Sequence, residues 1–367
     1  MSISQLISYI APGAPATRRP ARGDEPFLRP EVGFTPRWYR EALGIDFGRR
    51  WHTDVRYRRE AALAMRGELR RRFPDTYIGG IDRPDDPLDL LTGAFGACTV
   101  AAIFGLPIVY YADNWPNVGH RYVTREQMAA IEPPDLETNP MFQELLRQVG
   151  EIEALEGRAI GFINWQGILN NAQRLRGQDL FLDLYEVPQL AHHLFDVICD
   201  TVIDAIRRLH ERQRAGGVDY RFATISNCLV NMISPAQYEQ FFLLRDRRTA
   251  VAFETLGLHN CAWSADPYLN LYATIPNLGY IDMGIDSDLA KARVLMPNAR
   301  RALMYTPMNL AEKPIAAIRA DLERMAREYA PCDVVLADID SGTQDQRVLS
   351  VVTLCAELSK VYGANNP

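Results

Sequence analysis

The sequence predicts an α/β fold, a single-domain (β/α)8 barrel of the TIM type preceded by an N-terminal extension. Short apolar or β-branched runs alternate with longer amphipathic helical patterns from about residue 33 to the end of the chain. No internal linker interrupts this alternation. The 367 residues, of which 47% are hydrophobic and 23% charged, are enough to form one large core.

The alternation can be followed element by element. Two long stretches, 187–213 and 312–330, place apolar residues at intervals of three and four, as amphipathic helices do. A doubly wound sheet is the alternative fold, but no G-x-G-x-x-G sequence follows an early strand. The glycines of "GAFGAC" (93–98) lie in a helical pattern, where they favour close packing. The candidate strands are 76–81, 108–112, 159–164, 220–226, 255–261, 278–284, 302–307 and 334–339.

Residues 1–32 are expected to form an extension that is partly flexible or contacts another subunit. Residues 11–30 are rich in Pro, Ala and Arg and have no hydrophobic periodicity. The start of the chain has no basic region of the kind that opens a secretory signal, and no apolar run reaches the length of a membrane span. We therefore expect a barrel over residues 33–367 and no association with a membrane.

Charge and cysteine content narrow the class of protein further. The net charge of −6 argues against a general nucleic-acid-binding protein, which needs clustered Lys and Arg. The six cysteines show no paired spacing, which suits a reducing compartment better than a disulfide framework. These features predict a cytoplasmic protein that does not bind nucleic acid.

A metal site is suggested by His259 and Cys261, which are two positions apart in "TLGLHNCAWSAD". In an extended strand, residues i and i+2 project to the same face, so both side chains would point into one space. The alternative is a strand end whose histidine bonds a carbonyl and whose cysteine packs as a small apolar residue. Catalytic zinc sites have three protein ligands and one open position. We expect Asp340, which follows the last strand, as the third ligand, with Asp338 or Cys228 as alternatives.

Four stretches resemble the uroporphyrinogen decarboxylase superfamily, from about residue 33 to the C-terminus. They are "GFTPRWYREALGIDFG", "GQDLFLDLYEVPQLAHHLFDVI", "MISPAQYEQFFL" and "DIDSGTQDQRV". The Ser-Pro-x-x-Tyr-x-x-Phe pattern falls at Ser234, Pro235, Tyr238 and Phe241. The resemblance implies a TIM barrel and a homodimer.

The sequence is more similar to one enzymatic branch of this superfamily than to the other. The N-terminal Arg-Gln-x-Gly-Arg-Tyr motif and the Gly-His-Gly loop of the decarboxylases are not evident. The zinc methyltransferases carry His-x-Cys after the fifth strand and a cysteine after the last. His259 and Cys261 match the first part, and Asp340 takes roughly the place of the cysteine. The resemblance thus implies Zn²⁺ held by these three residues, with the catalytic task of activating a thiol. The thiol would be methylated from a methylcorrinoid, which a corrinoid-binding protein could supply, or from another small methyl donor.

Residues near strand ends are candidates for substrate binding, because barrel enzymes build their sites there. Two other functions stay open. A metal-free decarboxylase or lyase would use Arg37, Arg40 and a strand-end aspartate on a carboxylated substrate, and a non-catalytic barrel would only bind a small molecule. The candidate substrate contacts are Arg37, Arg40, Trp165, Gln166, Asn170 and Cys228.

Overall fold

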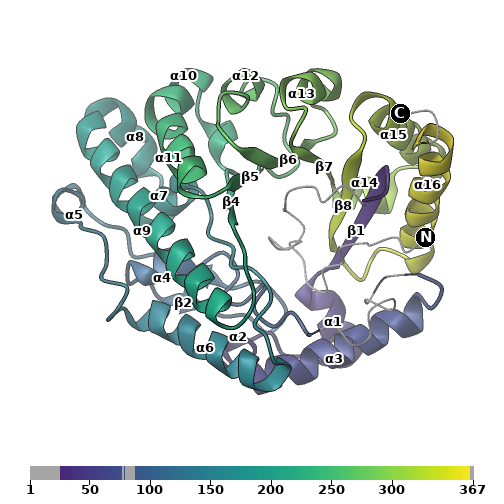
Figure 1. Cartoon of the computed structure of the whole chain (residues 1–367), viewed down its shortest axis with the longest axis horizontal. Coiled ribbons are helices and arrows are strands. Elements are labelled where there is room, and N and C mark those ends of the chain that lie inside the picture. The colour runs from purple at the N-terminus through teal and green to yellow at the C-terminus, as the bar shows by residue number, and fades with distance from the viewer. Residues whose placement is uncertain (1–24, 77, 79–86, 364–367) are drawn as a thin grey trace.

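The computed structural model describes residues 25–76, 78 and 87–363 and contains a parallel six-stranded sheet (Figure 1). The order of neighbours in this sheet is β1-β8-β7-β6-β5-β4. A separate antiparallel pair is formed by β2 and β3. The strands are β1 (Leu28–Phe34), β2 (Ile108–Val109), β3 (Asn117–Val118), β4 (Phe222–Ser226), β5 (Thr255–His259), β6 (Leu278–Gly284), β7 (Arg300–Tyr305) and β8 (Cys332–Ile339).

Helices lie on the outside of the curved sheet (Figure 1). None of those in the described part of the chain has the length and hydropathy needed to cross a membrane. They are α1 (Pro36–Leu43), α2 (Arg49–Thr53), α3 (Val55–Arg72), α4 (Thr99–Ile103), α5 (Arg125–Ala130), α6 (Pro140–Glu156), α7 (Ile168–Arg176), α8 (Asp179–Glu186), α9 (Pro188–Ala215), η2 (Val230–Met232), α10 (Pro235–Tyr238), η3 (Glu239–Leu243), α11 (Leu244–Ala252), α12 (Leu269–Tyr272), α13 (Leu289–Leu295), α14 (Pro307–Glu312), α15 (Ile315–Glu328) and α16 (Asp345–Gly363).

The architecture is consistent with the predicted TIM-type barrel. Strands β4 to β8 follow one another in space as they do in sequence, and each neighbouring pair is parallel. Parallel strands joined by outer helices bring the carboxyl ends of all strands to one edge of the sheet. The ladder of described residues ends at β4 on one side and at β1 on the other.

Short capped connections lead from this edge into two of the helices. Thr35 follows β1 and accepts a hydrogen bond from the Trp38 amide, and Pro36 is the first residue of α1. Thr306 follows β7 and accepts from the Asn309 amide, with Pro307 next. A hydroxyl cap and a proline at the first helical position both favour a helix start directly after the strand.

Three expectations about strands differ from the structure, and a fourth falls mostly on residues that the structure does not describe. Residues 28–32, expected in the extension, belong to β1, which pairs with β8. Ile108 and Val109 pair with β3 outside the main sheet, and 159–164 has no strand ladder among the described residues. Most of the candidate strand 76–81 lies outside the described residues. The remaining candidate strands and both helical stretches are confirmed, the helices as α9 and α15.

Candidate metal centre and its cavity

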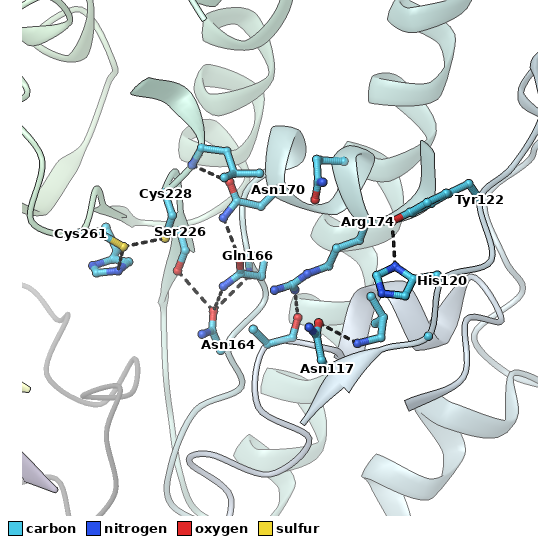
Figure 2. A pocket seen from close by; sticks show the side chains of 16 residues that line it. Asn117, His120, Tyr122, Asn164, Gln166, Asn170, Arg174, Ser226, Cys228 and Cys261 are labelled. Atoms are coloured by element: carbon cyan, nitrogen blue, oxygen red, sulfur yellow. Dashed lines mark hydrogen bonds between the residues drawn. The ribbon is translucent and has the colours of Figure 1, made fainter. Parts of the chain in front are cut away.

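Cys228, His259 and Cys261 bring three ligand atoms together at the carboxyl edge of the sheet (Figure 2). Their Sγ and imidazole nitrogen atoms all lie within 4.8 Å of one another. The Sγ atom of Cys261 is 2.9 Å from Sγ of Cys228 and 3.0 Å from Nε2 of His259. The residues that the structure describes contain no second group of three such ligands.

Two neighbouring strands bring these side chains together. Ser226, the last residue of β4, is paired with His259, the last residue of β5. Just beyond the ladder, the Asn227 amide donates to the His259 carbonyl at 2.6 Å. Cys228 and Cys261 each stand two residues past the end of their strand. The cluster therefore depends on the register of β4 and β5.

A buried carboxylate fixes the orientation of His259. The imidazole Nδ1 lies 2.6 Å from Oδ2 of Asp282, a residue of β6 that is fully buried. The Tyr280 hydroxyl donates to the same oxygen at 3.1 Å. With Nδ1 engaged by the carboxylate, Nε2 is the nitrogen that faces the thiols, an arrangement common to metal-binding histidines. Asp282 is not among the residues predicted from the sequence, although an acidic residue in the apolar strand "LGYIDMG" is a usable signal.

The backbone of Cys261 departs from strand geometry. Its φ angle is +59°, in the left-handed region that few non-glycine residues adopt. Asn260 holds the turn, because its amide nitrogen donates to Oδ1 of Asp282 and its side chain donates to the Asp282 carbonyl. The Tyr272 hydroxyl in turn donates to the Asn260 side chain. The contact between His259 and Cys261 thus depends on a turn, and not on the strand alternation that predicted it.

Asp340, the expected third ligand, lies outside this cluster of ligand atoms. Its carboxylate accepts a hydrogen bond from the Thr35 hydroxyl at 3.2 Å and lies 3.8 Å from the Arg37 guanidinium. Asp338 does not join the cluster either. The loop after β8 is directed to β1 and α1, whereas β4 is the neighbour of β5 in the sheet. Cys228, the alternative kept open, is the residue that the structure brings to the pair.

A cavity of about 460 Å³ opens beside the cluster. Three of the residues expected to contact a substrate, Gln166, Asn170 and Cys228, line it. Trp165, Arg37 and Arg40 are not among the described residues that line it. Trp165 is buried in the core, Arg37 lies near Asp113 and Asp340, and Arg40 near Asp46. The wall is formed by Ala97, Asn117, Val118, Gly119, His120, Tyr122, Asn164, Gln166, Asn170, Gln173, Arg174, Ser226, Cys228, Leu229, His259 and Cys261.

A chain of side-chain amides links the cavity wall to residues 227–229, the loop after β4 that carries Cys228 and is called the cysteine loop below (Figure 2). The Gln166 side chain donates to Asn164 at 2.7 Å and accepts from Asn170 at 2.7 Å. Asn170 also accepts from the backbone amide of Leu229, the residue after Cys228. These bonds tie the position of Cys228 to the wall on which a substrate would lie.

The helix that follows Gln166 supplies one wall of the cavity. Its start needs glycine at 167, because a Cβ there would lie 2.3 Å from the Asn227 side chain and 2.8 Å from the Ser226 carbonyl. On α7, Asn170, Gln173 and Arg174 face the cavity, as the three- and four-residue spacing of a helix allows. The apolar residues Ile168, Leu169, Ala172 and Leu175 face the core.

The Ser-Pro-x-x-Tyr motif is connected to the cysteine loop through the buried Asp246. Ser234 caps α10, and the Tyr238 hydroxyl donates to Oδ2 of Asp246 at 2.5 Å. The Asn227 side chain donates to the same oxygen at 2.8 Å. Burial raises the pKa of Asp246 to about 6. Through Asp246, the motif therefore helps to fix the position of Asn227, the residue before Cys228.

A family model for uroporphyrinogen decarboxylase (URO-D) matches residues 85–328, which is more than half of the chain. The chain belongs to the uroporphyrinogen decarboxylase family. No curated protein matches the sequence. Among solved structures, a methyltransferase from Methanosarcina mazei is similar, with a TM-score of 0.62 and 17% identity over 87% of this chain and 90% of the other. At this identity the likeness shows a shared fold. The family assignment confirms the resemblance seen in the sequence.

Proposed function

We propose that this member of the uroporphyrinogen decarboxylase family is a zinc-dependent methyltransferase that methylates a small thiol. The observation that carries the proposal is the cluster of Cys228, His259 and Cys261 beside a cavity. The structural likeness to a methyltransferase supports it. The proposed methyl donor is a methylated corrinoid on a partner protein, as the sequence resemblance implies.

The donor set fits zinc. One imidazole and two thiolates are common zinc ligands, and the two sulfurs make the site softer than the expected His, Cys and Asp set. The two thiols are 2.9 Å apart, lie beside the imidazole and are partly exposed, so Cys228, His259 and Cys261 are the residues that would hold the ion.

The residues of the chain have distinct tasks in this reaction. When bound, zinc would lower the pKa of a substrate thiol and favour the nucleophilic thiolate. Asp282 keeps Nε2 of His259 turned to the cluster, and the Asn164, Gln166 and Asn170 amides offer hydrogen bonds to the rest of the substrate. The reaction forms an S–CH3 bond, breaks the bond between the methyl group and its donor, and releases the thiol proton to solvent.

Metal content tests the ligand assignment directly. We would purify the wild type anaerobically with a reductant, add zinc, dialyse without chelator, and measure zinc by elemental mass spectrometry. The variants Cys228→Ala, His259→Ala and Cys261→Ala are expected to lose most of the zinc that the wild type holds, near one equivalent. Asp340→Ala is the matched control and should keep it, because its carboxylate lies outside the cluster.

Two outcomes would contradict the proposal. A wild type that binds no zinc would favour the metal-free decarboxylase or lyase, which keeps its activity in the presence of a chelator. Zinc that is lost from Asp340→Ala but kept by Cys228→Ala would restore the ligand set expected from the sequence. Methylation of thiols by a methylcorrinoid, followed with the zinc-loaded protein, tests the reaction itself.

A further inference from the structure

Two of the six cysteines have surroundings that differ from those of the other four. All six lie in the described part of the chain, where none is in a disulfide. Cys228 and Cys261 are partly exposed and line the cavity. The other four are buried, and burial raises the pKa of each of these thiols, for example to about 11 in Cys98 and to about 12 in Cys332. Because oxidants react with accessible thiolates, they reach the exposed pair before the buried thiols.

The sulfur atoms of Cys228 and Cys261 are in contact. Their Sγ atoms are 2.9 Å apart, and the dashed line between them in Figure 2 passes no other side chain. The two sulfurs of a disulfide are about 2.05 Å apart, so an approach of about 0.9 Å would complete the bond. Each cysteine stands two residues past the end of its strand, outside the paired residues of β4 and β5. The approach therefore requires movement of two short connecting segments and leaves the register of the strands unchanged.

The cavity gives a small oxidant access to both sulfurs. It has a volume of about 460 Å³, and its described lining residues include no Asp or Glu. Arg174 lines the same cavity and is close enough to Cys228 for their charges to interact. Partial exposure and a nearby positive charge are the surroundings in which reactive cysteines are found. The pair thus combines contact, access and a favourable electrostatic environment.

We propose that hydrogen peroxide oxidises Cys228 and Cys261 to an intramolecular disulfide, which removes two metal ligands and reversibly switches the protein off. One sulfur attacks the O–O bond and becomes a sulfenic acid, and the other oxygen leaves as water. The second sulfur then forms the S–S bond and displaces the remaining oxygen as water. In sum, two thiols and one hydrogen peroxide give one disulfide and two waters. The loss of metal rests on the proposed function, whereas the formation of the disulfide does not.

Peptide mapping of the metal-free protein tests the pairing. The reduced wild type is stripped of metal, freed of chelator and reductant, treated with a small excess of hydrogen peroxide and digested with trypsin under non-reducing conditions. Trypsin separates the two cysteines, since 222–245 contains only Cys228 and 249–291 only Cys261. We expect these two peptides to be joined. Two of the six thiols should be lost to Ellman's reagent in denaturant and recovered after reduction.

Variants of single cysteines make the test specific. In Cys228→Ser the partner of Cys261 is missing, so we expect no joined peptides and a sulfenic acid at Cys261 that dimedone captures. Cys261→Ser makes the same test from the other side if the first variant does not fold. Cys98→Ser is the control, because Cys98 is buried and a serine keeps its hydrogen bond to the Pro116 carbonyl. It should form the joined peptides as the wild type does. A wild type in which peroxide joins other cysteines, or joins none, would overturn the proposal.

Zinc release tests the switch and separates it from the proposed function. In the zinc-loaded wild type, peroxide should release zinc to a chromogenic indicator at the rate at which the disulfide forms, until about a tenth or less remains bound. Reduction with tris(2-carboxyethyl)phosphine should restore binding. Zinc that stays bound, or that leaves without the disulfide, would overturn the switch while the proposed function stands. A wild type that binds no zinc would contradict the proposed function, and the peptide map of the metal-free protein would still decide whether the disulfide forms.

Discussion

At the scale of single residues, replacing the carboxylate behind His259 should weaken zinc binding. In Asp282→Asn an amide NH2 group replaces one carboxylate oxygen, and it faces either the imidazole Nδ1 or the backbone amide of Asn260, both of which bond the carboxylate in the wild type. We expect zinc affinity to fall by about 10- to 100-fold, as for other residues that orient a metal ligand. Competition with a chromogenic zinc chelator measures this. Tyr280→Phe, which keeps the contact between Asp282 and His259, is the control, and an equal loss in both variants would contradict the role of the carboxylate.

The members of the cluster differ in how far sequence spacing predicts them. The spacing of His259 and Cys261 predicted that they meet, and their reactive atoms lie 3.0 Å apart. Strand alternation alone does not produce this contact, because β5 ends at His259 and a left-handed turn brings Cys261 back. Spacing could not identify the third member, since Cys228 and Asp340 both follow strands and only the order of strands in the sheet, with β4 beside β5, distinguishes them.

At the scale of elements, the helix that carries the Ser-Pro-x-x-Tyr motif supports the cysteine loop through one buried acid. Tyr238 and Asn227 both donate to Asp246, and the Asn227 amide also extends the β4 to β5 ladder to His259. The motif marked this helix in the sequence, but Asp246 stands eight residues after Tyr238, outside the motif. The sequence alone therefore does not predict that Asp246 supports the cysteine loop; its contacts with Tyr238 and Asn227 exist only in the folded chain.

Asp246 gives the stability of the protein a measurable dependence on pH. Its folded pKa is raised by burial from 3.8 to about 6, so between these values the folded state holds a proton that the unfolded state has lost. Its contribution to the free energy of unfolding therefore declines as pH rises from about 4 to 6, by on the order of 3 kcal/mol. Urea unfolding at pH 4, 5, 6 and 7 should show Asp246→Asn gaining stability relative to the wild type over this window. The exposed Asp286→Asn should follow the wild type, and a constant difference for Asp246→Asn would refute the shift.

At the scale of the whole molecule, β1 and β8, the first and last strands of the main sheet in sequence order, are joined by buried charged side chains. The sequence pattern of β1 does not reveal this pairing. In β1, "LRPEVGF", Arg29, Pro30 and Glu31 interrupt the apolar pattern that marks other strands, which is why 28–32 was expected in the extension. The structure buries Arg29 against Asp333 of β8, which lies 304 positions further along the chain. A strand whose charges are neutralised by a partner so distant in sequence cannot be recognised from its own residues. Figure 1 shows β1 beside β8 and near α16.

Removing this buried acid should destabilise the whole fold. Asp333 accepts two hydrogen bonds from Arg29, at 2.8 and 2.7 Å, and is also bonded by Arg300, and all three side chains are buried. Asp333→Ala leaves two buried guanidinium groups without this partner, so we expect the free energy of unfolding to fall by about 3–5 kcal/mol. Urea unfolding measures it, and Asp333→Asn, which keeps the shape, provides a milder variant. Asp219→Ala, at an exposed ion pair, should change little. Equal stability of Asp333→Ala and Asp219→Ala would mean that β1 is held to β8 by its backbone ladder and apolar contacts alone.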